Sequence, residues 1–221
     1  MTTSSSRSVT TDVGITSLGL AGILGTPQEP IGVVLFAHGS GSGRLSPRNT
    51  YVANRLQRAG LATLLFDLLT DREAGDRSNV FDIELLAERL TVATAWAREQ
   101  DAIKHLPLGY FGASTGAAAA LVAAARARDD IAAVVSRGGR PDLAEPLLNE
   151  VLAPTLLIVG GDDTGVLELN QKALATLRCE KRLDIVPGAT HLFEEPGALD
   201  AVVDLAREWF TAHMGDRARR S

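Results

Sequence analysis

Six short runs of apolar residues recur along the chain, each bounded by polar residues, glycine or proline. Runs of this length that are rich in β-branched and aromatic residues are typical of strands buried on both faces of a sheet. The pattern therefore predicts buried strands over residues 31–37, 61–66, 106–111, 131–136, 154–160 and 181–186. An earlier segment, 13–27, is interrupted by glycine and predicts one or two edge strands.

The segments between these runs carry apolar residues at helical spacing. The clearest is 82–100, in which the residues that share one face are Ile83, Leu86, Leu90, Ala93 and Trp96. Further helices are predicted over 47–59, from near Ser114, over 166–177 and over 196–214. Strands that alternate with helices in this way predict an α/β fold, with a mostly parallel sheet and helices on both faces.

The connections between the predicted elements are short, and no polar linker divides the chain. We therefore expect a single domain over residues 1–216, followed by a basic tail over 217–221 that we expect to be disordered. No large insertion separates the late strands, so no cap domain is expected. In sheets of this kind, ligands bind beyond the carboxyl ends of the strands, and the loops that follow the strands are the places to look for chemistry.

Composition narrows the class of protein. Of the 221 residues, 45% are hydrophobic and 22% are charged, and the formal net charge of −5 gives no reason to expect nucleic acid or an acidic membrane as a partner. The one cysteine, Cys179, excludes an internal disulfide framework. The start, MTTSSSRSVTTD, has no apolar core of a secretory signal, and no run reaches the roughly 18 apolar residues of a membrane span. We expect a cytoplasmic protein, and the oligomeric state stays open.

The stretch GYFGASTGAAAA, residues 109–120, places a serine between a predicted strand and a predicted helix. Gly112-Ala113-Ser114-Thr115-Gly116 is a G-x-S-x-G pentapeptide, which in this context indicates a nucleophile on a tight turn. Glycine is needed two positions before and after the serine because a Cβ there would clash with the neighbouring strand and helix. The Thr115 amide at the helix start would donate to an oxyanion. The simpler alternative is a glycine-rich turn with a serine helix cap.

A serine nucleophile needs a base, and the base needs an acid that orients it. Among the four histidines, His191 follows the sixth predicted strand and precedes the last helix, at the same sheet edge as Ser114, and we favour it as the base. The loop GGDDTG, 160–165, offers Asp162 and Asp163 as the acid, and the order Ser, Asp, His is a known triad order. Either aspartate could instead cap the next helix.

The loop HGSGSG, 38–43, follows the first buried strand and is the predicted source of a second oxyanion donor. Its glycines let a backbone amide approach a reacting carbonyl, and Ser40 is the expected donor. The rival interpretation is a phosphate-binding loop. The segment lacks the lysine and the following serine or threonine of a P-loop, and it lacks a G-x-G-x-x-G pattern.

Arginines follow two of the predicted strands and could grip a substrate carboxylate. The candidate substrate-binding residues are Arg44, Arg137 and Arg140. The alternative, which we favour, is that they form ion pairs with nearby acids such as Asp142 and Glu145.

The motifs FAHGSGSG, GASTG, GGDDTG and GATHLFEEPG together resemble the α/β-hydrolase superfamily, and within it the small dienelactone hydrolase-like branch without a cap. The resemblance runs over nearly the whole chain. The family's G-x-x-D pattern, matched by Gly160 to Asp163, implies Asp163 as the acid. Dienelactone hydrolases carry a cysteine nucleophile, whereas this chain has Ser114 at that position, which favours ordinary ester chemistry.

These observations predict a serine carboxylesterase that cleaves small or short-chain esters through an acyl-enzyme intermediate. Ser114, His191 and Asp163 would form the triad, and the amides of Ser40 and Thr115 would hold the oxyanion. No metal or organic cofactor is expected, since the sequence has no H-E-x-x-H motif or paired Cys/His spacing. The alternatives are a thioesterase, lactonase, amidase or peptidase on the same triad, or a hydrolase-fold protein that binds without catalysis.

Overall fold

The computed structural model describes residues 8–15 and 18–218 of the chain. The strands β1 to β8 span Val9–Ile15, Leu20–Thr26, Gly32–Ala37, Leu61–Phe66, Leu108–Ala113, Ile131–Arg137, Thr155–Gly160 and Lys181–Val186. The helices α1 to α6 span Pro47–Arg58, Asp71–Ala74, Ile83–Glu99, Thr115–Ala127, Thr164–Thr176 and Ala198–Ala218. The 3₁₀ segments η1 to η3 span Asn79–Phe81, Arg128–Asp130 and Pro141–Glu150.

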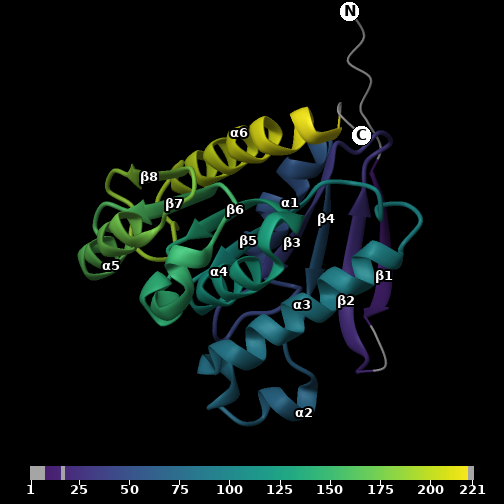
Figure 1. Ribbon diagram of the computed structural model, residues 1–221, viewed down its shortest axis with the longest axis horizontal. Coiled ribbons are helices and arrows are strands. Elements are labelled where there is room, and N and C mark those ends of the chain that lie inside the picture. Colours follow the sequence, from purple (N-terminus) through teal and green to yellow (C-terminus); the bar gives the residue numbers. More distant parts are fainter. Residues whose placement is uncertain (1–7, 16–17, 219–221) are drawn as a thin grey trace, which may run out of the picture.

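In the described part of the chain, the strands form one sheet of eight in the order β1-β2-β4-β3-β5-β6-β7-β8. β1 and β2 form an antiparallel hairpin whose second strand pairs antiparallel with β4, and all other neighbours are parallel (Figure 1). The chain reverses direction across the sheet at β3, which lies between β4 and β5. Such a reversal opens a crevice at the carboxyl ends of the strands on either side of it. The loops after β3 and β5 meet there.

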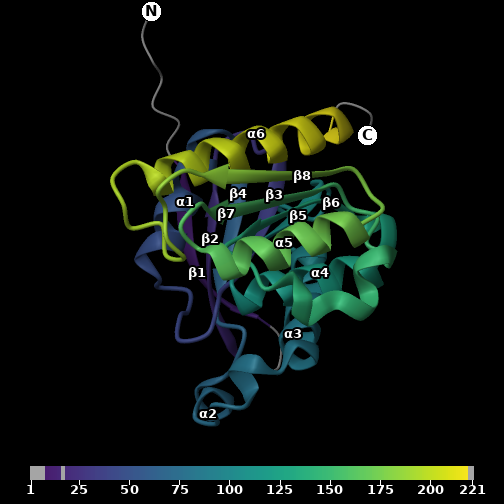
Figure 2. The same ribbon diagram turned by 90° about the vertical axis from the view of Figure 1, so that its left-hand side faces the viewer.

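Helices cover both faces of the sheet, as the hydrophobic pattern predicts. α1 and α6 cover one face, where the buried residues include Phe36, Phe111 and Phe210. α3, α4, α5 and η3 cover the other face, and Figure 2 shows α6 on the opposite side of the sheet from α3 to α5. Every residue of β3 to β7 is buried, which explains why these strands read as continuous apolar runs.

The structure confirms the predicted α/β fold as a single domain, and it adds elements that the sequence does not predict. α2, η1 and η3 lie in segments without a clear apolar period, and α2 is a single turn closed by a capping box between Thr70 and Glu73. α6 runs as far as Ala218, into the expected basic tail. Residues 219–221 of that tail lie outside the described residues.

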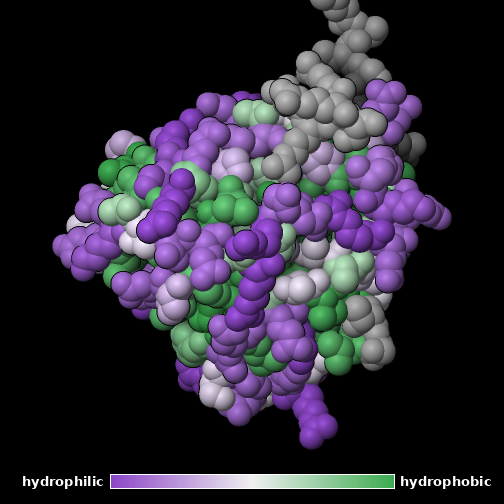
Figure 3. All heavy atoms as spheres, in the orientation of Figure 1, coloured by the Kyte–Doolittle hydropathy of each residue, from purple (hydrophilic) through white to green (hydrophobic). Residues whose placement is uncertain are grey.

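Polar residues predominate on the face of the molecule drawn in Figure 3, and apolar groups are scattered between them. Among the described residues, no helix combines the length and the apolar character that crossing a bilayer requires.

Candidate active site

Ser114 stands at the junction of β5 and α4 in a strained backbone conformation. Its φ is 51° and its ψ is −122°, a combination that residues other than glycine rarely adopt. The two flanking glycines make the turn possible. A Cβ on Gly112 would lie 2.4 Å from the Cα of Ala117, and a Cβ on Gly116 would lie 2.1 Å from the carbonyl oxygen of Ala37. Both positions therefore require glycine, as the pentapeptide predicts.

Backbone hydrogen bonds hold the strained residue on both sides. The Ser114 amide donates to the carbonyl of Arg137 over 3.3 Å, and the Ser114 carbonyl accepts from the amide of Arg140 over 3.1 Å. Ser114 is also the one partly exposed residue in the stretch 108–125, which is otherwise buried. The turn therefore presents a single side chain to solvent at the carboxyl edge of the sheet.

His191 and Asp163 form a hydrogen-bonded pair at the same edge. Nδ1 of His191 lies 2.7 Å from Oδ2 of Asp163. Asp163 is the residue before α5, but its side chain makes no capping hydrogen bond, so its carboxylate faces the histidine instead. The neighbouring Asp162 is exposed. The geometry thus favours Asp163 over Asp162, in agreement with what the resemblance implies.

Close backbone approaches bring the loops after β6, β7 and β8 together. A Cβ on Gly160, at the end of β7, would lie 2.2 Å from the carbonyl oxygen of Ala189, two residues before His191. A Cβ on Gly138 would lie 3.5 Å from the His191 ring, and Gly138 follows the residue whose carbonyl binds the Ser114 amide. No hydrogen bond joins the hydroxyl of Ser114 to His191 within the described ranges, and contacts of this kind are often long before substrate binds.

The loop after β3 packs directly on the serine. A Cβ on Gly39 would lie 3.0 Å from the Cβ of Ser114. The amide of Ser40, the predicted oxyanion donor, donates to the side-chain oxygen of Thr115 over 3.2 Å. The amide of Thr115 is the first of α4 and lies among the helix-start amides that have no acceptor within the helix. Both predicted donors therefore lie beside Ser114, and one of them already has an acceptor.

His38 has a structural role that the sequence did not reveal. Its Nε2 accepts a hydrogen bond from the Leu68 amide over 3.0 Å, and its Nδ1 lies 3.0 Å from the carbonyl of Gly39. Because an amide can only donate, the ring must be neutral with its proton on Nδ1. Burial lowers the pKa of His38 below the ordinary 6.5, which favours this neutral form. The ring thus ties the loop after β3 to the loop after β4.

Asn170 is a second buried polar residue that supports the site. Its side-chain nitrogen donates to the carbonyl of Gly139 over 3.0 Å and to the carbonyl of Val166 over 2.8 Å. Gly139 lies between the residue against the His191 ring and the residue that binds the Ser114 carbonyl. The helical spacing of 166–177 places Asn170 on the inner face of α5, and the side chain is fully buried there.

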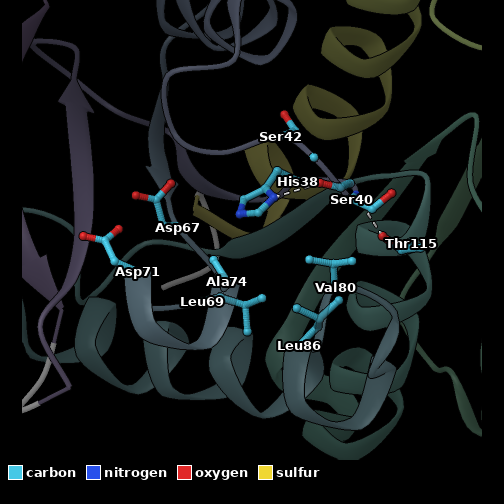
Figure 4. Close-up of a pocket in the computed structure, with 12 residues that line it drawn as sticks. His38, Ser40, Ser42, Asp67, Leu69, Asp71, Ala74, Val80, Leu86 and Thr115 are labelled. Atoms are coloured by element: carbon cyan, nitrogen blue, oxygen red, sulfur yellow. Dashed lines mark hydrogen bonds between the residues drawn. The ribbon is translucent and has the colours of Figure 1, made fainter. Parts of the chain in front are cut away.

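A pocket of about 280 Å³ opens beside the loop after β3. Its polar side includes Ser40 and Thr115, and its apolar wall consists of Leu69, Ala74, Val80 and Leu86. Figure 4 shows Ser40 and Thr115 on one side of the pocket and the side chains of Leu69, Val80 and Leu86 along its floor. The segment with α2 and η1 therefore supplies a wall that the sequence does not predict.

The three candidate arginines differ in their partners. Arg44 forms an ion pair with Asp67, and Arg140 binds Asp142 through two hydrogen bonds of 2.8 and 2.7 Å. These pairs agree with the alternative favoured from the sequence, although the sequence does not predict Asp67 as the partner of Arg44. Arg137 is only 8% exposed, and its Nε and Nη1 have no hydrogen-bond acceptor among the described residues.

The two remaining histidines make contacts outside this arrangement. His105 is exposed, and His213 on α6 contacts Glu180. Within residues 8–15 and 18–218, no three His, Cys, Asp or Glu side chains gather closely enough to hold a metal ion.

The chain is similar to proteins of known family and structure. The model of the dienelactone hydrolase family matches residues 20–212. The crystal structure of dienelactone hydrolase from Anabaena variabilis shares 55% identity with a TM-score of 0.90, over 95% of this chain and 99% of that one. Est1E from Butyrivibrio proteoclasticus has the same fold, with 16% identity and a TM-score of 0.78 over 92% of this chain and 98% of that one.

A Mycobacterium tuberculosis protein that carries the provisional name phosphoribosyl transferase is 62% identical over 195 residues. The match covers 88% of this chain but only 44% of that protein, so the chain spans about half the length of this curated relative.

The family match extends over most of the chain, and the 55% identical structure shares its whole fold. Both findings agree with the family resemblance noted from the sequence. The chain therefore belongs to the dienelactone hydrolase family, whose members are hydrolases, and it has the fold of the α/β-hydrolase superfamily.

Proposed function

We propose that this protein is a serine carboxylic ester hydrolase that cleaves small or short-chain esters through an acyl-enzyme intermediate. The observation that carries the proposal is the strained Ser114 at the start of α4, next to the edge where His191 binds Asp163 over 2.7 Å. Strain that the surrounding backbone enforces at a solvent-facing side chain is typical of catalytic residues. A histidine oriented by a carboxylate is the base that a serine nucleophile requires.

The proposed reaction has two steps. Ser114 Oγ attacks the ester carbonyl while Nε2 of His191 takes the hydroxyl proton and then passes it to the departing alcohol. Asp163 accepts the hydrogen bond from Nδ1, which leaves Nε2 free to act as the base and stabilises the positive ring that forms. Water then attacks the acyl-enzyme with the same histidine as base. The acid is released and Ser114 is restored.

The oxyanion of each step would be held by two backbone amides. The Thr115 amide lies at the start of α4, where the helix dipole also favours a negative charge. The Ser40 amide would be the second donor. An oxyanion would have to replace the Thr115 hydroxyl, which now accepts from that amide over 3.2 Å. Because a charged oxygen is the stronger acceptor, this exchange favours the transition state over the ground state.

The pocket supports a small acyl or alcohol group. Its volume of about 280 Å³ and its wall of Leu69, Val80 and Leu86 suit a short apolar chain next to the oxyanion loop. The same triad would also serve a thioesterase, lactonase or amidase, and only a panel of substrates separates these activities.

The transferase named in the mycobacterial relative is not proposed for this chain. The alignment covers 44% of that protein, and the region matched here belongs to a hydrolase family. The named activity is therefore outside what the shared residues support.

The test is hydrolysis of 4-nitrophenyl acetate and butyrate by the wild type and by the Ser114→Ala variant, together with labelling by a fluorophosphonate. We expect the wild type to turn over both esters and to be labelled at Ser114, and the variant to lose both properties. Ser78→Ala, which changes an exposed serine in the segment between α2 and η1, is the matched control and should retain both. Equal rates for wild type and Ser114→Ala would favour the non-catalytic binding protein.

A further inference from the structure

The side-chain hydroxyl of Thr115 is buried beside the nucleophile and uses only part of its hydrogen-bonding capacity. Thr115 follows Ser114 at the start of α4, and only 3% of the residue is exposed. Its Oγ1 accepts the amide of Ser40 over 3.2 Å, and no residue in the described part of the chain accepts its hydroxyl proton. A threonine hydroxyl can both accept and donate, so this one still has a proton to donate.

The place of Thr115 in its helix explains the unused proton. Inside a helix, a threonine hydroxyl can donate to the backbone carbonyl four residues earlier. Thr94 in α3 does so, with the carbonyl of Leu90 as acceptor over 2.9 Å. Thr115 is the first residue of α4, and the residue four positions before it, Phe111, belongs to β5. The acceptor that a threonine finds inside a helix is therefore missing at this position.

This proton lies in the wall of the pocket next to the nucleophile. Thr115 and Ser40 both line the pocket of about 280 Å³, and Figure 4 shows the hydrogen bond that joins them at its edge. A Cβ on Gly39 would lie 3.0 Å from the Cβ of Ser114, so the loop that carries Ser40 packs against the nucleophile. Oγ1 belongs to the same residue as one proposed oxyanion amide and is bonded to the other. An oxygen held by both amides must therefore lie close to Oγ1.

We propose that the hydroxyl of Thr115 is a third donor to the oxyanion, in addition to the two backbone amides. The inference rests on the proposed function and makes this side chain a catalytic residue. In the free protein, Oγ1 accepts the Ser40 amide. When the carbonyl oxygen of the ester takes over that amide, the hydroxyl turns and donates to the same oxygen. Only hydrogen bonds are exchanged, and the proton stays on Thr115.

The exchange acts on the rate of reaction more than on the binding of substrate. A hydrogen bond to a charged oxygen is roughly twice as strong as one to a neutral carbonyl. The Thr115 hydroxyl therefore binds the oxyanion more tightly than it binds the ester that precedes it. An interaction that strengthens in the transition state raises kcat and leaves KM nearly unchanged.

The first experiment measures kcat and KM for 4-nitrophenyl butyrate in the wild type, Thr115→Val and Thr115→Ser. Valine keeps the shape of threonine and removes the hydroxyl. We expect kcat to fall about 10- to 100-fold in Thr115→Val with KM changed less than about twofold, and to recover for the most part in Thr115→Ser. Thr94→Val is the matched control, because it removes a buried hydroxyl bound to Leu90 and Tyr110 away from the site, and it should keep the wild-type kcat.

The outcomes separate the two proposals. If the wild type hydrolyses no ester, the proposed function fails and the third donor fails with it. If the wild type hydrolyses esters and kcat of Thr115→Val equals or exceeds that of the wild type, the third donor alone is wrong, because the hydroxyl then only occupies the place of the oxyanion. Thr115→Ala also removes the hydroxyl, and it repeats the test if Thr115→Val does not fold, which far-ultraviolet circular dichroism detects.

A second experiment observes the contact directly with butylboronic acid. The Ser114 oxygen forms a bond to boron, its proton passes to His191, and the tetrahedral adduct carries an oxygen where the oxyanion would lie. A crystal structure of the wild-type adduct should place Oγ1 of Thr115 within about 3.2 Å of that oxygen. The inhibition constant should rise in Thr115→Val by about the same factor as kcat falls. An adduct in which Oγ1 still binds the Ser40 amide, or an unchanged inhibition constant, would overturn the third donor.

Discussion

Asp163 accepts a hydrogen bond from His191 over 2.7 Å, although it stands at the start of α5, where an aspartate commonly caps the helix. Its side chain makes no capping bond, so the carboxylate is used for the histidine alone. Asp163 and the adjacent, exposed Asp162 therefore form a matched pair for mutation.

Asp163→Asn should reduce kcat for 4-nitrophenyl butyrate by about 10³- to 10⁴-fold, because an amide in that place favours the wrong tautomer of His191. Asp162→Asn changes an exposed side chain one residue away and should leave kcat near the wild-type value. Steady-state kinetics of the two variants show which aspartate orients His191. A larger loss in Asp162→Asn than in Asp163→Asn would reverse the assignment of the acid.

Gly116→Ala should destabilise the fold and displace the loop after β3. The added Cβ would lie 2.1 Å from the carbonyl of Ala37 and 2.5 Å from that of His38, so the backbone must move. We expect the free energy of unfolding to fall by about 1–3 kcal/mol in urea titrations, with a loss of ester hydrolysis. Gly165→Ala, in α5 with no atom within 4 Å of its Cβ, should be neutral or stabilising by up to about 1 kcal/mol.

His38 predicts a pH dependence of stability. Burial lowers its folded-state pKa below 6.5, so the unfolded chain binds this proton more readily than the folded chain does. Its contribution is therefore complete above about pH 6.5 and is lost as the pH falls from there through the folded-state pKa. Urea unfolding between about pH 5 and pH 8 should show a steeper loss of stability toward acid in the wild type than in His38→Gln.

The glutamine variant keeps an acceptor for the Leu68 amide but has no titrating ring. The carboxylates of Glu73 and Glu195 have pKa values below 4.5, so they stay ionised over this range in both proteins. If the free energy of unfolding changed with pH in the same way in wild type and in His38→Gln, the pKa of His38 would not differ between the folded and unfolded states.

The apolar wall of the pocket predicts a change in chain-length preference. Val80→Phe places a larger side chain in a pocket of about 280 Å³ and so leaves less room in it. The hydrolysis of esters with longer acyl chains should therefore be slowed more than that of the acetate. We expect the ratio of kcat/KM for 4-nitrophenyl butyrate to that for the acetate to fall about tenfold. Leu152→Phe, at an exposed position before β7, controls for the added ring and should not change the ratio.

The sequence was sufficient for the parallel sheet because β3 to β7 are buried on both faces and appear as unbroken apolar runs. The turn at Ser114 was also predictable from its two flanking glycines. A Cβ on either glycine would lie within 2.4 Å of a backbone atom, so no other residue fits there. α2 and η1 were not predicted because their residues are largely polar or exposed, and their one local signal is the capping pair Thr70 and Glu73.

The charged partners were less predictable because pairing depends on which loops meet in space. Arg44 binds Asp67, which follows a different strand, whereas Arg140 binds Asp142 two residues away. Nothing in the sequence around Arg137 indicates burial, because its cover comes from Phe193 in a loop far along the chain. Similarly, the acceptor of the Ser40 amide, the Thr115 hydroxyl, is 75 residues away.

The partial exposure of Ser114 within the buried stretch 108–125 has a consequence for chemical probes. A reagent that reaches this stretch meets the Ser114 hydroxyl as its one partly exposed side chain, with the Thr115 hydroxyl in the wall of the adjoining pocket. The selectivity of inhibitors would then depend on the loops around Ser114, which control access to it, and not on other nucleophiles beside it.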